Sequence, residues 1–158
     1  MELREAREQD WARIWPVFRE TVAAGETYVY PDGLDSETAR PWWMHDHVVV
    51  AEEGQELLGS ATCGPNRPGR GGHVATASFM VAPAARGRGV GRLLGQHALG
   101  WAREHGYRSM QFNAVVETNT VAVALWQSLG FTVVGTVPQA FDSRRHGLVG
   151  LHVMHRPL

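Results

Sequence analysis

The sequence predicts a mixed α/β (α+β) fold, in which a mostly antiparallel sheet of six to seven strands contains a parallel central pair and carries helices on both faces. Helical segments open the chain, and a run of short strands joined by turns follows them. The second half then alternates strand and helix. A strand–helix–strand unit over residues 73–115 requires a parallel, right-handed crossover. With 158 residues, 44% of them hydrophobic, we expect one domain over residues 1–158.

Two helices are expected before the first strand. Asp10 is expected to cap a helix that begins at Trp11, and Pro16 to kink it. A loop rich in Tyr, Pro and Gly follows, and Ser36 is expected to cap a short helix that ends near residue 44.

Strands are expected where the hydrophobic period changes from helical spacing to alternation. Their ranges are 47–53, 56–64, 73–81, 108–115, 131–137 and 148–156. Two helices interrupt this series, one that ends at Gly106 and one over residues 119–129 that ends at Gly130. Phe141, Asp142 and His146 are placed in a loop between the last two strands.

Composition excludes several classes of function. The net charge of −1 is too near neutral for a nucleic-acid partner, and no apolar run reaches membrane-spanning length. All 15 basic residues are arginine, so Schiff-base lysine chemistry and a Walker-type phosphate loop are absent. The single cysteine, Cys63, excludes an all-cysteine metal site, and His45 and His47 cannot form a metal site alone. The start of the chain does not read as a signal peptide, and we expect a cytoplasmic protein.

A Gly-rich loop, Arg-Gly-Arg-Gly-Val-Gly at residues 86–91, lies between a predicted strand and a predicted helix. Glycines let the main chain approach a ligand closely, and the first amides of a helix are unpaired donors at the positive end of its dipole. The pattern indicates a phosphate site. A dinucleotide fingerprint is not matched, because Arg92 stands at its third glycine position. Taken alone, the motif leaves a simple surface turn open.

Two motifs together resemble the GNAT superfamily of N-acetyltransferases. Arg86-x-x-Gly89-x-Gly91, after Val81-x-Pro83, is similar to the acyl-CoA pyrophosphate loop of that family. Residues 119–131, Asn-x-x-Ala-x-x-Leu-Trp-x-x-x-Gly-Phe, are similar to a second family motif that usually has Tyr in place of Trp. The resemblance implies the GNAT fold over nearly the whole chain. It is closest to small-molecule amine and amino-acid acetyltransferases of the phosphinothricin-acetyltransferase kind.

What the resemblance implies is transfer of an acetyl group from acetyl-CoA to a primary amine of a small molecule or amino acid. The amine attacks directly in a ternary complex, with no covalent enzyme intermediate and no metal. Dimers are common in the family, so a homodimer is also implied. The residues implied to hold acetyl-CoA are Phe79, Met80, Val81, Arg86, Gly87, Arg88, Gly89, Val90, Gly91, Arg92, Asn119, Ala122 and Trp126. For Asn119, simple capping of a helix is an equal alternative.

The resemblance also implies groups for catalysis. An amide near Met80 or Val81 would hold the thioester oxygen. The sequence departs from the family where Trp126 replaces a Tyr general acid, since an indole cannot play that part. The strand over residues 73–81 also lacks the Glu found in many relatives.

Replacement groups for acid–base work are few. In that strand, Thr76 and Ser78 could only order a water molecule. Glu117, just beyond the next strand, is our candidate base, with a solvated loop acid as the alternative. His146 and His152 are further candidates, because histidine titrates near neutral pH.

The acceptor end is implied to be lined by Glu26, Tyr28, Tyr30, Trp42, Phe141 and Asp142, a set that suits a cationic or amphipathic amine. Packing of the Tyr-rich loop on the core is the alternative. Two other functions stay open. One is acetylation of a protein N-terminus or lysine, and the other is a non-catalytic CoA-binding sensor, suggested by the missing Tyr and Glu. A nucleotide-binding module is a distant third.

Overall fold

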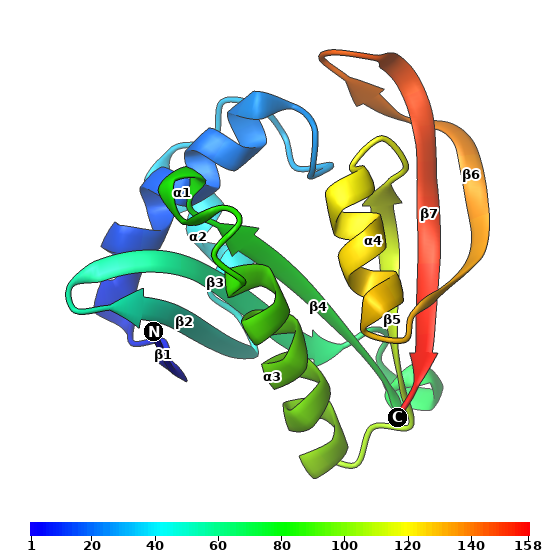
Figure 1. Ribbon diagram of the computed structural model, residues 1–158, viewed down its shortest axis with the longest axis horizontal. Helices are drawn as coiled ribbons and strands as arrows, with labels where there is room; N and C mark the ends of the chain where they lie inside the picture. Colours follow the sequence, from blue (N-terminus) through cyan, green and yellow to red (C-terminus); the bar gives the residue numbers. More distant parts are fainter.

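A computed structural model describes residues 1–158 and contains one seven-stranded sheet (Figure 1). Its strands are β1 (Glu2–Glu5), β2 (His47–Glu53), β3 (Glu56–Pro65), β4 (Val74–Val81), β5 (Ser109–Val116), β6 (Thr132–Ser143) and β7 (Gly147–Pro157). Their order in the sheet is β1-β2-β3-β4-β5-β7-β6. Every neighbouring pair is antiparallel except β4 and β5. The predicted mixed sheet with a parallel central pair is therefore confirmed.

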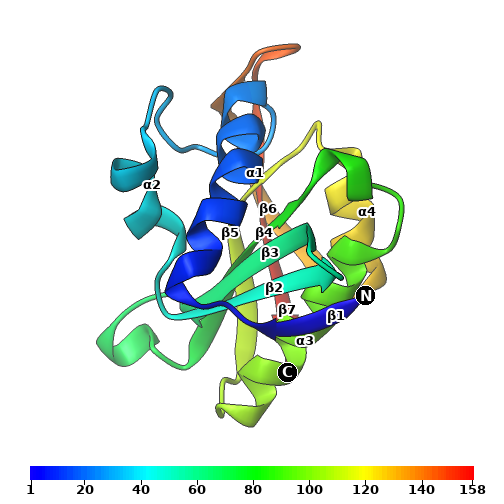
Figure 2. The ribbon, with the colours of Figure 1, turned by 90° about the vertical axis from the view of Figure 1, so that its left-hand side faces the viewer.

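Helices cover both faces of the sheet, as predicted. They are α1 (Trp11–Ala24), α2 (Ser36–Trp43), α3 (Val90–Glu104) and α4 (Thr120–Ser128). Figure 2 shows α1 and α2 on one side of the sheet and α3 and α4 on the other. Alternation along β4 assigns its side chains to these two layers. Met80 packs in the cluster of α1 and α2 with Trp43, whereas Phe79 packs against Phe112 and Trp126 beneath α3 and α4.

The parallel pair is short. β4 and β5 pair only at Val74 with Ser109 and at Ala75 with Met110. Beyond these pairs the two strands diverge, as Figure 1 shows, so the second half of β4 has no β5 partner along its edge. An unpaired edge of main-chain donors and acceptors in the middle of a sheet is a place where an extended ligand can pair.

The N-terminal segment differs from the prediction. β1 was not expected, because three of its four residues are charged and its sequence shows little alternation. Asp10 does not cap α1 with its side chain. Its carboxylate instead accepts a hydrogen bond from the Arg7 amide at 2.7 Å and pairs with the Arg4 guanidinium at 2.7 and 2.9 Å. α1 also runs unbroken through Pro16.

The cap of α2 lies one residue earlier than predicted. Asp35, not Ser36, is the capping residue, and its carboxylate accepts a hydrogen bond from the Thr38 amide at 2.8 Å. The Asp35 amide in turn donates to the Thr38 hydroxyl at 3.1 Å, which completes a reciprocal capping box.

The predicted loop between the last two strands is wrong. β6 continues to Ser143, and Phe141 pairs with Val149 on β7. The register shifts between Val137 and Phe141, where Gln139 has a φ of 53°. Such a bulge interrupts the alternation from which strands are recognised, and for that reason the sequence ended the strand too early.

None of the helices combines the length and the hydropathy that crossing a membrane requires.

Candidate active site

The Gly-rich loop has the conformation that an anion site requires. Gly87 and Gly89 have φ angles of 76° and 82°, a region that favours glycine, and a Cβ at either position would meet no atom within 4 Å. Gly89 is the N-cap of α3, so the amides of the first helical turn point into open space with no intrahelical acceptor. The loop therefore presents unpaired donors at the positive end of a helix, as a pyrophosphate requires.

The three arginines of this loop differ in their surroundings. The Arg88 guanidinium pairs with the Glu53 carboxylate at 2.6 Å, and this contact lowers the pKa of Glu53. The Arg92 guanidinium donates to the Ser128 hydroxyl at 2.8 Å. Arg86 is exposed and forms no ion pair. Arg86 is thus the loop's free cation, whereas Arg88 would have to leave Glu53 to bind a phosphate.

The hydrogen-bonding direction along β4 decides which amides are available. The Ala82 amide donates to the Leu58 carbonyl on β3 at 2.8 Å. Main-chain groups alternate direction along an antiparallel strand, so those of Met80 also face β3. The amides of Phe79 and Val81 face the opposite way, toward the diverging β5. Of the two amides predicted to hold the thioester oxygen, that of Met80 thus faces β3 and is not available, whereas that of Val81 faces the open edge together with that of Phe79.

The edge group at Phe79 is occupied by a side chain from the loop after α1. The Tyr28 hydroxyl accepts a hydrogen bond from the Phe79 amide at 2.9 Å and donates to the Phe79 carbonyl at 2.5 Å. Burial raises the pKa of Tyr28, with a further contribution from Tyr30. The phenol therefore remains a neutral donor over the whole physiological range of pH.

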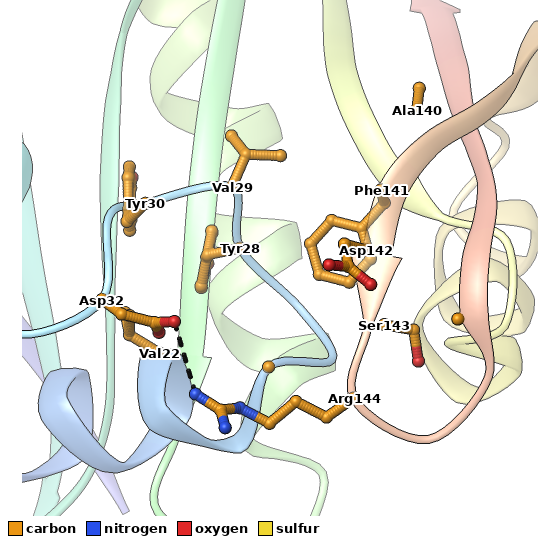
Figure 3. Close-up of a pocket in the computed structure, with 12 residues that line it drawn as sticks. Val22, Tyr28, Val29, Tyr30, Asp32, Ala140, Phe141, Asp142, Ser143 and Arg144 are labelled. Atoms are coloured by element: carbon orange, nitrogen blue, oxygen red, sulfur yellow. Dashed lines mark hydrogen bonds and ion pairs between the residues drawn. The ribbon is translucent and has the colours of Figure 1, made fainter.

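A cavity of about 690 Å³ opens between this loop and the β6–β7 hairpin (Figure 3). Twelve residues from the end of α1, the following loop and the hairpin line it: Val22, Gly25, Tyr28, Val29, Tyr30, Asp32, Ala140, Phe141, Asp142, Ser143, Arg144 and Gly147. Four of the six predicted acceptor residues, Tyr28, Tyr30, Phe141 and Asp142, are brought together here. Tyr28 thus touches both the cavity and the edge of β4.

Trp42, which packs against Tyr30, is not part of the lining, and neither is Glu26. The Glu26 carboxylate accepts hydrogen bonds from the Ser143 hydroxyl at 2.6 Å and the Arg145 amide at 2.8 Å. The contact with Ser143, followed by that with Arg145, lowers the pKa of Glu26. Glu26 therefore joins the loop after α1 to the hairpin, and in this way it holds the two walls of the cavity together.

Sequence reasoning placed Asp142 at the acceptor end but missed the other charged groups of the cavity, Asp32 and Arg144. The Arg144 guanidinium pairs with the Asp32 carboxylate at 3.3 Å, and the Asp142 side chain lies nearby (Figure 3). A Cβ on Gly25, which has a φ of 67°, would lie 2.4 Å from the Arg144 side chain. Only Gly25, the C-cap of α1, offered a signal in the sequence, because the partners come from segments more than a hundred residues apart.

Other predicted residues lie outside the cavity. Glu117 is exposed, and its carboxylate accepts a hydrogen bond from the Gly150 amide at 2.6 Å, which ties the end of β5 to β7. The Asn119 side chain caps α4 by accepting from the Ala122 amide at 3.3 Å. Trp126 is buried beside Phe79, with ring centroids 4.6 Å apart.

The remaining candidates occupy other positions around the sheet. Ser78 lies beside the Tyr30 hydroxyl on the α1 and α2 side. His146 is exposed at the turn of the hairpin, and the His152 Nδ1 atom lies 2.7 Å from the Thr136 hydroxyl. Neither histidine lines the cavity.

Comparison with known proteins places this geometry in a family. A model of the acetyltransferase (GNAT) family matches residues 9–131. The structure of a GCN5-related N-acetyltransferase from Kribbella flavida superposes with a TM-score of 0.96 at 60% identity, over 99% of this chain and 97% of that chain. The structure of yncA from Salmonella typhimurium, with its cofactor acetyl-CoA, superposes with a TM-score of 0.85 at 28% identity, over 100% and 94% of the two chains.

Curated relatives differ in length. The Escherichia coli L-amino acid N-acyltransferase MnaT is 28% identical over 145 residues, which cover 88% of this chain and 84% of that protein. By contrast, the match to the Schizosaccharomyces pombe N-acetyltransferase aca1, 38% identical over 90 residues, covers only 43% of that longer protein.

Proposed function

Because this chain belongs to the GNAT family of acetyltransferases, we propose that it transfers the acetyl group of acetyl-CoA to the primary amine of an amino acid or a similar small molecule. The observation that carries the proposal is the position of Tyr28. Its side chain lines the polar, aromatic cavity while its hydroxyl lies on the unpaired edge of β4. A site for an amine thus adjoins a site for an extended acyl carrier.

The residues around α3 and β4 fit acetyl-CoA. The amides of Val90, Gly91 and Arg92 would hold the pyrophosphate, and Arg86 would add charge. The main chain of Val81 would pair with the pantetheine arm in the manner of an added strand. Acetyl-CoA supplies the acetyl group as a thioester with a thiolate leaving group.

The cavity favours an acceptor with charges of both signs. Arg144 is paired with Asp32, and an acceptor carboxylate would bind Arg144 in place of that side chain. Asp142 and the released Asp32 would then face the acceptor amine. A free amino acid has this combination of groups, and the relative MnaT is described as an L-amino acid N-acyltransferase.

Direct transfer suits the residues that are present. Cys63 is 1% exposed, and burial raises the pKa of its thiol to about 12, so a cysteine nucleophile is not available. Trp126 is buried and cannot protonate the leaving thiolate. We infer that the neutral amine attacks the thioester carbon, that the C–S bond breaks to release the thiolate, and that the amine proton passes to water. The implied homodimer and the cytoplasmic location stay predictions.

The test is acetyl-CoA titration followed by thiol release with a panel of acceptors. The panel holds free L-amino acids, their carboxamides, decarboxylated amines and short peptides. We expect binding of acetyl-CoA, and thiol release that is at least tenfold faster with a free amino acid than with its carboxamide, the discrimination that loss of one charged hydrogen bond produces. Preference for peptides would favour protein acetylation instead, and binding without release would favour a sensor.

The matched variants are Arg144→Gln and Arg145→Gln. The first removes the guanidinium from the cavity and should abolish the preference for the free carboxylate. The Arg145 side chain is exposed and outside the lining, so Arg145→Gln should retain that preference.

A further inference from the structure

The Tyr28 hydroxyl occupies both main-chain groups by which Phe79 could pair with a neighbour. The Phe79 amide donates to the Tyr28 oxygen at 2.9 Å, and the phenol hydrogen goes to the Phe79 carbonyl at 2.5 Å. Both groups lie on the edge of β4 where pairing with β5 ends after Ala75. A molecule that extends along this edge must therefore share the Phe79 amide with the phenol or displace it.

The position of the phenol is well defined by its packing. The Tyr28 ring stacks on Tyr30 with centroids 5.0 Å apart and an interplanar angle of 12°, and it meets Trp43 edge-on at 6.1 Å. Tyr28 belongs with the side chains that pack on the α1 and α2 cluster, while it also lines the cavity. The ring is thus held by aromatic neighbours, and a small movement of the hydroxyl exchanges its partner without moving the loop.

We propose that Tyr28 is a catalytic residue, whose hydroxyl joins the Phe79 amide as a second hydrogen-bond donor to the thioester carbonyl oxygen. This inference rests on the proposed acetyl transfer. Two donors that converge on one point provide the arrangement that stabilises negative charge on a carbonyl oxygen. Burial raises the pKa of Tyr28, so the phenol stays protonated and keeps the hydrogen that this hydrogen bond requires.

The reaction balances without a proton from Tyr28. The amine lone pair forms the N–C bond while the carbonyl π electrons move onto oxygen. The negatively charged oxygen accepts hydrogen bonds from the Tyr28 hydroxyl and the Phe79 amide. These electrons return as the C–S bond breaks, and the thiolate leaves with its pair. The proton lost from nitrogen goes to water.

The experiment compares the wild type with Tyr28→Phe, which keeps the ring and removes the hydroxyl. The control is Tyr107→Phe, because Tyr107 packs against Trp101 and does not line the cavity. We expect Tyr28→Phe to lower kcat about a hundredfold, the usual effect of losing one oxyanion donor. Its dissociation constant for acetyl-CoA should change less than threefold, and Tyr107→Phe should match the wild type. Wild-type kcat in Tyr28→Phe, or a loss of acetyl-CoA binding that accounts for the fall, would overturn the proposal.

A measurement that needs no turnover separates this inference from the proposed function. The carbonyl stretch of acetyl-CoA labelled with ¹³C at the carbonyl should fall in frequency on binding to the wild type, and fall less on binding to Tyr28→Phe. Thermal unfolding confirms that the variant is folded at the assay temperature. If the carbonyl frequency does not change when acetyl-CoA binds to the wild type, this result alone overturns the role of Tyr28. A wild type that shows the shift but acetylates nothing contradicts the proposed function and leaves the assignment of Tyr28 supported.

Discussion

The Ser143 hydroxyl donates a hydrogen bond of 2.6 Å to the Glu26 carboxylate across 117 positions of sequence. The Arg145 amide donates to the other oxygen of the same carboxylate at 2.8 Å. One side chain thus fastens the tip of the β6–β7 hairpin to the loop after α1, and these two segments are the walls of the cavity. The width of the acceptor site therefore depends on a residue that does not line it.

The first prediction concerns this link. Glu26→Ala should raise KM for the acceptor about tenfold, the size of effect expected when a charged hydrogen-bond acceptor is lost, because the hairpin is no longer held against the loop. The affinity for acetyl-CoA should not change, since the Gly-rich loop lies at α3. Steady-state kinetics and calorimetry measure the two quantities. Glu20→Ala, an exposed residue of α1, is the control. An unchanged acceptor KM in Glu26→Ala would show that the hairpin keeps its position without this contact.

The second prediction tests the phosphate loop. Gly89→Glu places a negative side chain in the open space before α3, and should weaken acetyl-CoA binding by at least a hundredfold through repulsion. Gly106→Glu is matched, because Gly106 follows the other end of α3 and has a φ of 78°, close to the 82° of Gly89, with nothing near its Cβ position. Both variants carry the same backbone strain. Equal affinities in titration calorimetry would refute the assignment of the loop.

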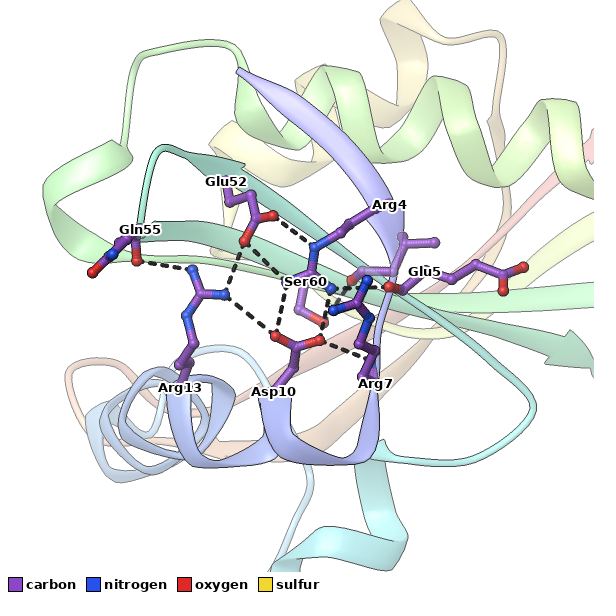
Figure 4. A network of polar contacts seen from close by, with 9 residues as sticks. Arg4, Glu5, Arg7, Asp10, Arg13, Glu52, Gln55 and Ser60 are labelled. Carbon is purple, nitrogen blue, oxygen red and sulfur yellow. Dashed lines mark hydrogen bonds and ion pairs between the residues drawn. The ribbon is translucent and has the colours of Figure 1, made fainter.

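The third prediction concerns the ion pairs that join β1, α1 and β2 (Figure 4). The Asp10 side chain is 3% exposed, and its contact with Arg4, which is hydrogen-bonded to both carboxylate oxygens, lowers its pKa. Arg4 and Arg13 also pair with Glu52 at 2.6 and 2.8 Å. Asp10→Ala removes the buried carboxylate that Arg4 and the Arg7 amide share, leaves Arg4 with Glu52 as its only carboxylate partner, and should cost about 3 kcal/mol of stability. Urea unfolding gives the value.

The control for that variant is Glu8→Ala, since the Glu8 side chain is 93% exposed and its ion pair with Arg40 is long, at 3.5 Å. A loss in Asp10→Ala no larger than in Glu8→Ala would show that the network contributes little. Because the pKa of Asp10 is lowered in the folded state, its contribution is present above the unfolded pKa of 3.8 and is lost as the pH falls below that value.

The fourth prediction concerns a histidine pair on the α3 face. The His47 and His97 Nε2 atoms lie 3.1 Å apart, and His47 stacks on Trp101 with centroids 5.0 Å apart. Burial lowers the pKa of both histidines, mutual repulsion lowers that of His47 further, and Glu5 partly opposes the shift. The unfolded chain therefore binds protons below about pH 6.5 that the folded chain resists, so stability should fall as the pH drops from 7.5 to 5.5.

Urea unfolding at several pH values measures this slope, which cannot exceed one proton for each histidine of the pair. His97→Gln should flatten it, because it removes one of the two titrating groups and the repulsion on the other. His73→Gln is the control, as His73 is exposed and precedes β4. A slope that is the same in His97→Gln and in the wild type would assign the acid sensitivity to other groups.

Local patterns account for the parts of the fold that were predicted. β2 contains an apolar run and β4 consists of apolar or small side chains, and the ranges of both strands agree with the prediction to within one residue. β1 was missed because Glu2–Glu5 becomes a strand only by pairing with β2, with Leu3 opposite Ala51. β6 was cut short because its bulge before Phe141 hides the alternation.

In the candidate site too, features set by neighbouring residues could be predicted, whereas those set by distant partners could not. The phosphate loop could be recognised because positive φ angles at Gly87 and Gly89 are a property of a few adjacent residues. The contacts of Glu26, Met80 and Glu117 could not be predicted from the sequence. Glu26 and Glu117 depend on partners in the distant β6–β7 hairpin, and the direction of the Met80 amide depends on the register of β4 against β3.

By itself, the sequence determined the order of helices and strands after β1, the glycine loop before α3 and the two motifs that resemble the family, all of which are encoded by neighbours in the chain. Only the folded chain determined that Tyr28 meets the main chain of Phe79, and that Arg144 faces Asp32. These contacts join segments 51 and 112 positions apart, so they arise from the packing of α1, β4 and the hairpin rather than from any local pattern. The side chains of the proposed acceptor site therefore converge only after the sheet has formed.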